Sequence, residues 1–531
     1  MFRQFKRTRI LLVMVMIVSL IITGCGSGSN LGDGDENSIC YIAHYVDPCP
    51  IWDPAESSGT ENQVLLQIYE TLLRYDSATS EFVGVLATDY SKNDDGTIWT
   101  FNLREDVKFH DGTDFNADAV KFSFERTIAI DKGSTYILVD LKEMRIIDDY
   151  TIEFIFNNPA PADLIVSSAY AACIYSPTAF TNDLEASSKW ANAGNACGTG
   201  PYMLDSQTPG NQVILTKHEE YWGGWGGSHF GKILFQLVAE DASRRQMLES
   251  GEADVVTRLM PDHIADLEKN DSINIVYYQT YANQLMFLNT QKPPLDNKLI
   301  RQALAYAFPY EDIIKYVKLG QGFVAKDIVP QSLWGTNQGD PYYYYDLNKS
   351  KELLTEAGYP DGGFKLEYTY MAGNEDRKKT AELYKAELAK IGIDLDIKGM
   401  QWDNMMAKVK ADNIADRQDI TTWMQYSSMI SPATWYEQNV HSDLRGVSWN
   451  HSYYSNLDVD SMIKDAYLLT GIDIEKAGEL YLEISKIVAE DCPIIYMGDE
   501  QGVVFTQNTF KGLVPDPAYK DVIFLYDCYR E

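Results

Sequence analysis

The stretch Thr97–Ile130 reads TIWTFNLREDVKFHDGTDFNADAVKFSFERTIAI and decides the fold of this chain. Its first half alternates polar residues with apolar ones, which are Trp99, Phe101, Leu103, Val107 and Phe109. That period of two predicts half-buried β-structure, and Asp111-Gly112 then supplies a tight turn. Asn116 can cap a following helix, with Val120, Phe124 and Ile128 on one face. The residues alone therefore predict a strand, a turn and a helix of an α/β domain.

The same stretch closely resembles the hallmark segment of the family 5 solute-binding proteins. The matching residues, in unbroken register, are Trp99, Phe101, Leu103, Arg104, Val107, Phe109, Asp111, Gly112, Ala117, Asp118, Val120 and Phe124. Further matches lie at Ile68–Asp76, Gly198–Tyr202, Phe287–Thr290 and Arg301–Leu304. Members of this family are extracytoplasmic receptors of ATP-driven importers for peptides, nickel complexes and related solutes. The resemblance implies an α/β fold: a two-lobed periplasmic-binding-protein-like clamp of type II, in the large cluster with an extra small domain in the first lobe.

The length of 531 residues is too great for one core and predicts two or three domains. The resemblance divides the chain as follows: lobe I from 39–68, 197–292 and 500–531, an extra domain of lobe I from 69–196, and lobe II from 293–499. Two or more strands are expected to cross between the lobes as a hinge. The net charge of −32 argues against nucleic acid as a partner. It could steer cationic solutes, or simply make a solvated acidic surface.

The N-terminus has the features of an export signal. Four basic residues precede the apolar run Ile10–Ile22, which is too short to span a bilayer comfortably. The run ends in Ile22-Thr23-Gly24-Cys25, which resembles the lipobox of bacterial lipoproteins. We therefore expect a signal peptide over 1–25, lipidation of Cys25 and anchoring to the bacterial cell membrane; ordinary cleavage or an uncleaved anchor are the alternatives. Residues 26–38, rich in Gly, Ser, Asp and Asn, predict a flexible linker.

Six further cysteines are Cys40, Cys49, Cys173, Cys197, Cys492 and Cys528. Outside the cytoplasm an even number permits disulfides, and buried free thiols are the other possibility. The pattern does not choose between them. No C-x-x-C occurs, which argues against a zinc ribbon or a thioredoxin-like site.

Later segments predict further regular structure. Leu366–Tyr370, Lys378–Ile391 and Ile393–Ile397 read as a β-α-β unit with a parallel strand pair. Helices are also expected at Asp241–Gly251 and within Ile472–Pro493, and strands in the tail Val503–Tyr529. Residues 226–232 have the G-x-x-x-x-G-K spacing of a phosphate-binding loop. Ile233 follows where Ser or Thr is needed, and a strand follows where a helix is needed, so we reject that site.

The ligand is expected between the lobes, in an enclosure with aromatic walls. By resemblance, Ser58, Gly59 and Thr60 correspond to the first-lobe backbone that pairs with an extended peptide. Trp402 and Trp423 correspond to wall tryptophans of the second lobe, although ordinary core packing is the alternative for each. We take Gln425 and Tyr426 as ligand-binding too.

Tyr426 is a departure from the family pattern. Peptide binders carry an aspartate at that place, three residues after the tryptophan, and it pairs with the α-ammonium of the ligand. A buried ammonium without a counter-charge would cost several kcal/mol. Either another carboxylate takes over, or the ligand is not held by an amine, and hydroxyls and amides around Gln425 would then suit a neutral solute such as a sugar derivative.

The function expected from the resemblance is capture of a small solute (an oligopeptide, a sugar derivative or a metal chelate) and delivery to an ABC permease and its ATPase. We expect a monomer, no cofactor, no catalytic residue and no metal ligand, since the seven histidines show no i, i+4 pair and no H-E-x-x-H. One alternative is a sensor or chaperone that presents ligand on the same fold. Another is a secreted hydrolase, although no G-x-S-x-G elbow or zincin motif is present.

Overall fold

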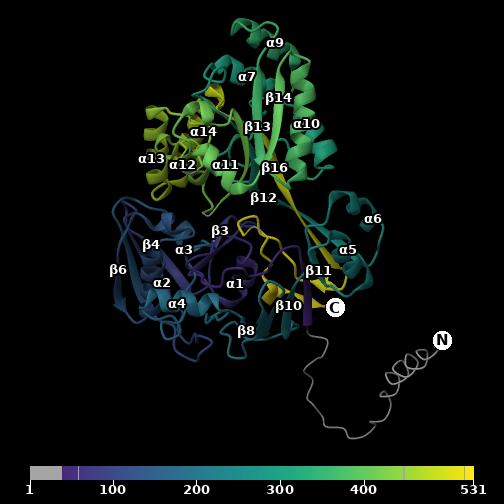
Figure 1. Ribbon diagram of the computed structural model, residues 1–531. Coiled ribbons are helices and arrows are strands. Elements are labelled where there is room, and N and C mark those ends of the chain that lie inside the picture. Colours follow the sequence, from purple (N-terminus) through teal and green to yellow (C-terminus); the bar gives the residue numbers. More distant parts are fainter. Residues whose placement is uncertain (1–38, 58, 428, 447–448, 520) are drawn as a thin grey trace, which may run out of the picture. The chain divides into compact units, whose positions relative to one another are not determined.

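The computed structural model describes residues 39–531 apart from 58, 428, 447–448 and 520 (Figure 1). The predicted signal peptide over 1–25, the lipidation site Cys25 and the linker 26–38 lie outside the described residues. Ile39–Glu531 forms one compact unit. Within this part of the chain, no helix combines the length and the apolar character that crossing a membrane requires.

The largest sheet of this unit is mixed and has ten strands. Its order is β14 (Asp394–Met400), β13 (Lys365–Met371), β15 (Ile420–Tyr426), β12 (Ile273–Leu288), β16 (Ile494–Gln507), β11 (Val255–Thr257), β1 (Ile39–His44), β10 (Lys232–Leu237), β9 (Gln212–Lys217) and β8 (Tyr202–Thr208). We call the half with β8 to β11 and β1 lobe I, and the half with β13 to β15 lobe II.

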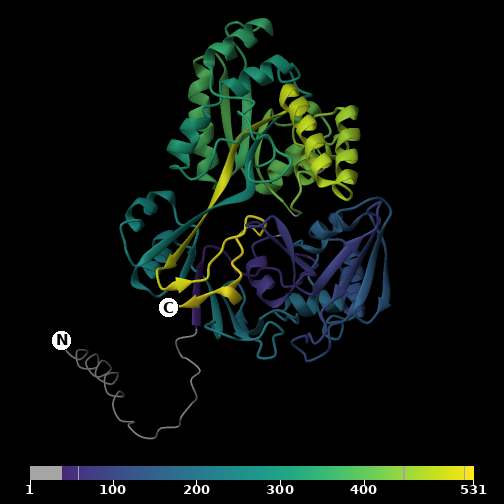
Figure 2. The ribbon, with the colours of Figure 1, turned by 180° about the vertical axis from the view of Figure 1, so that it is seen from behind.

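Only β12 and β16 belong to both halves. They pair antiparallel along most of their length, and their register shifts between Gln279 and Asn283, opposite Glu500. From Ala282 onward β12 pairs with β15, whereas β16 pairs with β11 from Val504 to Thr506. Figures 1 and 2 show both strands passing from one half into the other. The ladder is thus interrupted where the sheet changes lobe, which is where bending meets the least resistance.

Lobe II contains the predicted β-α-β unit. β13 and β14 pair in parallel, and α10 (Glu375–Ala389) connects them, which confirms the prediction from periodicity. α10 buries Ala381, Tyr384 and Leu388. Further helices of this lobe are α7 (Lys298–Tyr306), α9 (Leu347–Glu356), α11 (Trp402–Val409), α12 (Ala433–Asn439), α13 (Leu457–Thr470) and α14 (Ile474–Asp491).

The stretch Thr97–Ile130 contributes one strand, β5 (Ile98–Leu103), to a separate four-stranded sheet. The order of this sheet is β4 (Ala87–Lys92), β5, β7 (Thr151–Phe156) and β6 (Leu141–Asp148). As predicted, the Asn116 side chain caps α2 (Ala117–Ile130), accepting from the Ala119 N–H at 3.1 Å. Two details differ from the prediction. Residues 107–109 form only an isolated bridge, from Lys108 to Asp114. Ile128 is 38% exposed, because it lies in the last turn before the helix ends at left-handed Asp131.

A buried ion pair fixes the loop between β1 and α1 (Asn62–Ile68) to this extra domain. Both guanidinium ends of Arg126, on α2, donate to the carboxylate of Asp53, at 2.9 and 2.6 Å. Ser188 of α4 (Leu184–Asn192) donates to the same carboxylate. Although burial acts against the charge, the hydrogen bonds from Arg126 hold the pKa of Asp53 below its usual value. The loop before α1 is therefore fixed at Asp53 by the bonds from Arg126 and Ser188.

The C-terminal tail is less regular than predicted. Beyond β16, the described part of the tail has two short strands, β17 (Phe510–Lys511) and β18 (Tyr529–Arg530), and much of the described segment between them is loop. Its polar backbone is partly satisfied by Gln67 of α1, which donates to the Ile523 carbonyl and accepts from the Leu525 N–H. Side-chain bonds of this kind replace a strand ladder, so hydrophobic alternation alone could not predict the outcome.

Two smaller predictions are answered directly. Lys232, the end of the rejected phosphate-binding motif, begins β10, so a strand follows there as predicted. The helix α5 (Asp241–Ser250) ends at left-handed Gly251, as the glycine indicated.

All six cysteines of the described residues are free and buried, which decides between disulfides and thiols in favour of thiols.

Candidate functional site

Three tryptophans stack on lobe II. The Trp402 and Trp423 rings lie 4.9 Å apart between centroids, and Trp449 stacks on Trp423 at 4.7 Å. Trp402 is the first residue of α11, Trp423 lies within β15, and Trp449 follows in a loop. All three are only partly buried. The two tryptophans singled out in the sequence are thus brought together, and half-exposed stacked rings suit a ligand-facing wall better than a closed core.

Gln425 lies on the same face of β15 as Trp423, two residues along the strand. Its amide donates to the Gln438 side-chain oxygen of α12 at 3.0 Å. Gln438 in turn donates to the Tyr136 hydroxyl at 3.0 Å, and Tyr136 belongs to the extra domain. Two successive hydrogen bonds therefore join lobe II to the extra domain beside the tryptophan wall. The buried Gln425 side-chain oxygen has no partner among the described residues.

Tyr426 ends β15 and packs against the hydrophobic core of lobe I. Burial, together with the nearby Glu61 carboxylate, raises the pKa of the Tyr426 phenol. Burial, the Tyr426 phenol and the Glu61 carboxylate also contribute to raising the pKa of buried Tyr170. Tyr170 follows the short helix α3 (Ala162–Val166). A carboxylate from lobe I thus faces the position where peptide binders of this type have an aspartate on lobe II.

The loop before α1 is organised by Glu61. The Glu61 carboxylate accepts from the Ser57 hydroxyl at 2.9 Å and from the Gly59 N–H at 2.8 Å. Gly59 is exposed, Thr60 is half-buried, and the Thr60 carbonyl accepts from the Gln63 side chain. Ser58 lies outside the described residues. Because Glu61 already uses the Gly59 N–H, a ligand backbone that paired there would have to displace this bond.

Further contacts hold the lobes together away from the tryptophans. Lys92 of β4 donates to the Gly471 carbonyl, in the turn between α13 and α14, at 2.8 Å. Gly96 packs so closely on the same carbonyl that an added Cβ would lie 2.6 Å from it. Glu437 of α12 faces Asp140 of the extra domain, and burial followed by that charge raises the pKa of Glu437 to about 7. We interpret these contacts between the lobes as a closed form, with an acidic pair across the closure.

The histidines nearest the tryptophan wall in the sequence are His441 and His451. Among the described residues no group of three or more His, Cys, Asp or Glu side chains could hold a metal ion. His451 is buried beside Phe287 and Trp449, and His441 is half-buried. His441 lies 4.0 Å from the Asp443 carboxylate, and of the two only His451 contacts a ring of the wall within the described residues.

Sequence reasoning missed several residues of this site. Trp449, Gln438 and Glu61 were not singled out, because each comes from a different segment and only the fold brings them together. Glu61 carried one usable signal: it directly follows Ser58-Gly59-Thr60 and stands at the N-terminus of the helix that begins at Asn62, where a negative charge is favourable. Within the described residues its side chain makes no capping hydrogen bond there. No comparable local pattern marks Trp449 or Gln438.

Comparison with known proteins assigns this arrangement to a class. The profile of the family "Bacterial extracellular solute-binding proteins, family 5 Middle" matches residues 81–445. The chain belongs to this family. It is a solute-binding protein and not an enzyme, and the class works outside the cytoplasm with ABC transporters.

Individual relatives agree over nearly the whole length. The probable D,D-dipeptide-binding periplasmic protein DdpA of Escherichia coli K12 is 27% identical over 487 residues, which cover 91% of this chain and 92% of that protein. HbpA2 of Haemophilus parasuis superposes with a TM-score of 0.80 and 25% identity, over 93% and 100% of the two chains. The periplasmic binding protein DppA of Helicobacter pylori, solved with the peptide STSA, gives 0.76 and 26%, over 93% and 98%. The two-lobed clamp of this family is thus the fold of the chain.

Proposed function

We propose that this protein captures a short peptide or peptide-like solute between its lobes and delivers it to an ABC permease. The observation that carries the proposal is the pair of hydrogen bonds from Gln425 through Gln438 to Tyr136, which closes the lobes beside the stacked tryptophans. Relatives named for a D,D-dipeptide and solved with the peptide STSA support this choice of solute.

In this proposal the ligand lies against Trp402, Trp423 and Trp449, with Gln425 and Tyr426 at its edge. Aromatic walls provide contact area at little conformational cost, and they accept side chains of different shapes. The loop Ser58-Gly59-Thr60 contributes from lobe I. The hinge is the irregular part of β12 and β16 around Glu500, with lobe I formed by 39–68, 197–292 and 500–531, the extra domain by 69–196, and lobe II by 293–499.

Glu61 is proposed as the counter-charge for the ligand amine. Tyr426 cannot neutralise an ammonium, whereas the buried Glu61 carboxylate lies close enough to act on the Tyr426 phenol. A carboxylate already positioned by Ser57 and Gly59 needs little reorganisation to accept a cation. The ligand ammonium would still be the recognised group, but its carboxylate partner would lie on lobe I, at the start of α1, and not on β15 of lobe II.

Delivery of the solute to the permease requires that the protein be held at the membrane, which we assign to the N-terminal segment. We propose that Cys25 carries the lipid and that residues 26–38 tether the clamp to the outer face of the cell membrane. The closed lobes would then present one composite surface to the permease, whose ATPase drives import. Closure supplies the difference that a transporter needs to distinguish loaded from empty protein.

The test is mass spectrometry of solute released from protein purified without denaturation, followed by calorimetry with that solute. Peptide with a free amine should bind, and its N-acetylated form should bind about tenfold more weakly or worse. Glu61→Gln keeps an oxygen for Ser57 and Gly59 but removes the charge, so it should abolish that preference. Equal affinity of the free and acetylated peptides for the wild type would contradict the role of Glu61, and release of a sugar or metal chelate would contradict the solute class.

A further inference from the structure

A separate cavity lies within lobe I, away from the tryptophan wall. It measures about 180 Å³ and is lined by residues from the end of α1, the β2–β3 hairpin (Leu73–Asp76 and Glu81–Gly84), the turn at Tyr221-Trp222, and the C-terminal segment. No lobe II residue contributes to its lining. The volume exceeds the roughly 150 Å³ of an engineered apolar cavity that admits benzene. The space can therefore hold a small organic molecule.

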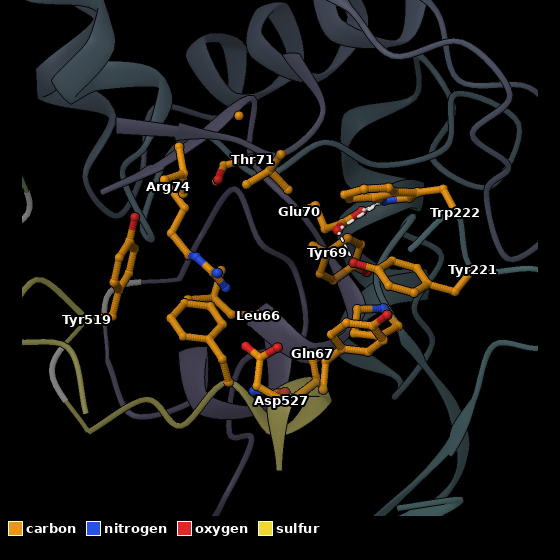
Figure 3. Close-up of a pocket in the computed structure, with 16 residues that line it drawn as sticks. Leu66, Gln67, Tyr69, Glu70, Thr71, Arg74, Tyr221, Trp222, Tyr519 and Asp527 are labelled. Carbon is orange, nitrogen blue, oxygen red and sulfur yellow. Dashed lines mark hydrogen bonds between the residues drawn. The ribbon is translucent and has the colours of Figure 1, made fainter. Parts of the chain in front are cut away.

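Most polar groups in the wall are already committed. The Glu70 carboxylate accepts from the Tyr221 hydroxyl at 2.9 Å and from the Trp222 indole N–H at 3.0 Å. It also accepts from the Thr199 hydroxyl at 2.8 Å. Burial raises the pKa of Glu70 to about 7. Gln67 is used by the C-terminal backbone, as described above. Figure 3 shows the bonds from Tyr221 and Trp222 to Glu70 along one side of the cavity.

Two charged side chains of the lining are different. The Arg74 guanidinium lies over the Phe524 ring, 4.5 Å from its centroid, and Figure 3 shows it pointing into the cavity. The Asp527 carboxylate enters the same space from another side. Among the described residues neither side chain takes part in an ion pair or a side-chain hydrogen bond. Arg74 is half-buried, and Asp527 is exposed at the mouth of the cavity. A cation and an anion thus face one aromatic-lined space.

We propose that this cavity is a second binding site, for a small zwitterion of the amino-acid type. The planar guanidinium of Arg74 matches a carboxylate through two parallel hydrogen bonds, and its stacking on Phe524 keeps the fork in place. Asp527 receives the ammonium group. Tyr221, Trp222 and Tyr526 supply an apolar wall for the side chain. The site is independent of the interlobe site and of its ligand.

Calorimetry and ligand-observed NMR on the full chain test this with three probes: L-phenylalanine, 3-phenylpropionate (no ammonium) and 2-phenylethylamine (no carboxylate). L-phenylalanine should bind at millimolar concentration, and both 3-phenylpropionate and 2-phenylethylamine should bind more weakly, because each lacks one of the two charged groups. Arg74→Gln should weaken L-phenylalanine and 3-phenylpropionate by about tenfold or more, because each loses a charge-assisted pair. Asp527→Asn should weaken the binding of L-phenylalanine, and it should not weaken the binding of 3-phenylpropionate, which has no ammonium group for Asp527 to hold.

Trp423→Ala is the control that separates the two sites, and it should leave L-phenylalanine binding unchanged. Arg74→Lys keeps the charge without the fork, so an intermediate loss in that variant supports the geometry even if Arg74→Gln folds poorly. The proposal is overturned if no probe binds the wild type at millimolar concentration. It is equally overturned if Trp423→Ala removes binding while Arg74→Gln preserves it, since the probe would then occupy the interlobe site.

Discussion

Solute affinity should rise as the pH falls, because closure buries Glu437 against Asp140. The pKa of Glu437 is about 7 in the closed form, compared with 4.5 for a free glutamate. Such a rise corresponds to roughly 3 kcal/mol between the protonated and ionised side chain. Tyr467 and Tyr481, on α13 and α14 of the same lobe, also lie near Glu437 and stay there on opening. Only part of the penalty, about 1–2 kcal/mol, is therefore lost when the lobes separate.

The sign follows from the direction of the shift. A carboxyl whose pKa is higher in the closed form than in the open form favours closure when protonated, and this advantage is lost as the pH rises through about 7. Calorimetry with the co-purified solute should show affinity roughly tenfold higher near pH 5 than near pH 8. Glu437→Gln should flatten the profile at the high-affinity level. Glu479→Gln, an exposed change of equal charge on α14, should leave it unaltered. An unchanged slope in Glu437→Gln would refute the reasoning, as would affinity that rises with pH.

Other expectations concern the wall, the anchor of the site loop and the thiols. Trp423→Ala should weaken the interlobe ligand by about 2 kcal/mol, on the order of thirtyfold, in the same calorimetric titration; normal affinity with intact fold would exclude the wall from the site. Arg126→Ala leaves the buried Asp53 carboxylate unpaired and should cost about 3–5 kcal/mol in urea unfolding, and a loss below 1 kcal/mol would contradict this. Burial raises the pKa of Cys173 and of Cys197 to about 12, so a thiol reagent should reach neither in the native protein and both after unfolding.

Local patterns predicted local structure well. The alternation through Trp99 and Phe101, the Asn116 cap and the β-α-β unit around α10 all depend on neighbours within a few residues, and the structure has each of them. The tail after β16 was wrongly expected to be mostly strands, because its hydrogen bonds go to Gln67, far away in the sequence.

In the candidate site, too, residues marked by a sequence pattern could be predicted, whereas contacts between distant segments could not. Trp402 and Trp423 could be singled out because a family pattern marks them, and the fold then stacks them. Trp449 joins them from a loop that no periodicity marks. Gln438 and Tyr136 meet only when two lobes close, a contact between residues about three hundred positions apart. The counter-charge that we propose, Glu61 in place of the aspartate replaced by Tyr426, depends likewise on the packing of one lobe against the other.

Small-angle X-ray scattering with and without the co-purified solute tests the central claim most directly. The account predicts that solute-free protein is more extended and that adding solute reduces the radius of gyration, with the solute recovered chemically unchanged. Gln438→Ala, which removes the bond to Tyr136, should shift the compaction to higher solute concentration. A radius of gyration that does not change with any bound solute, or a solute recovered in altered form, would contradict the account.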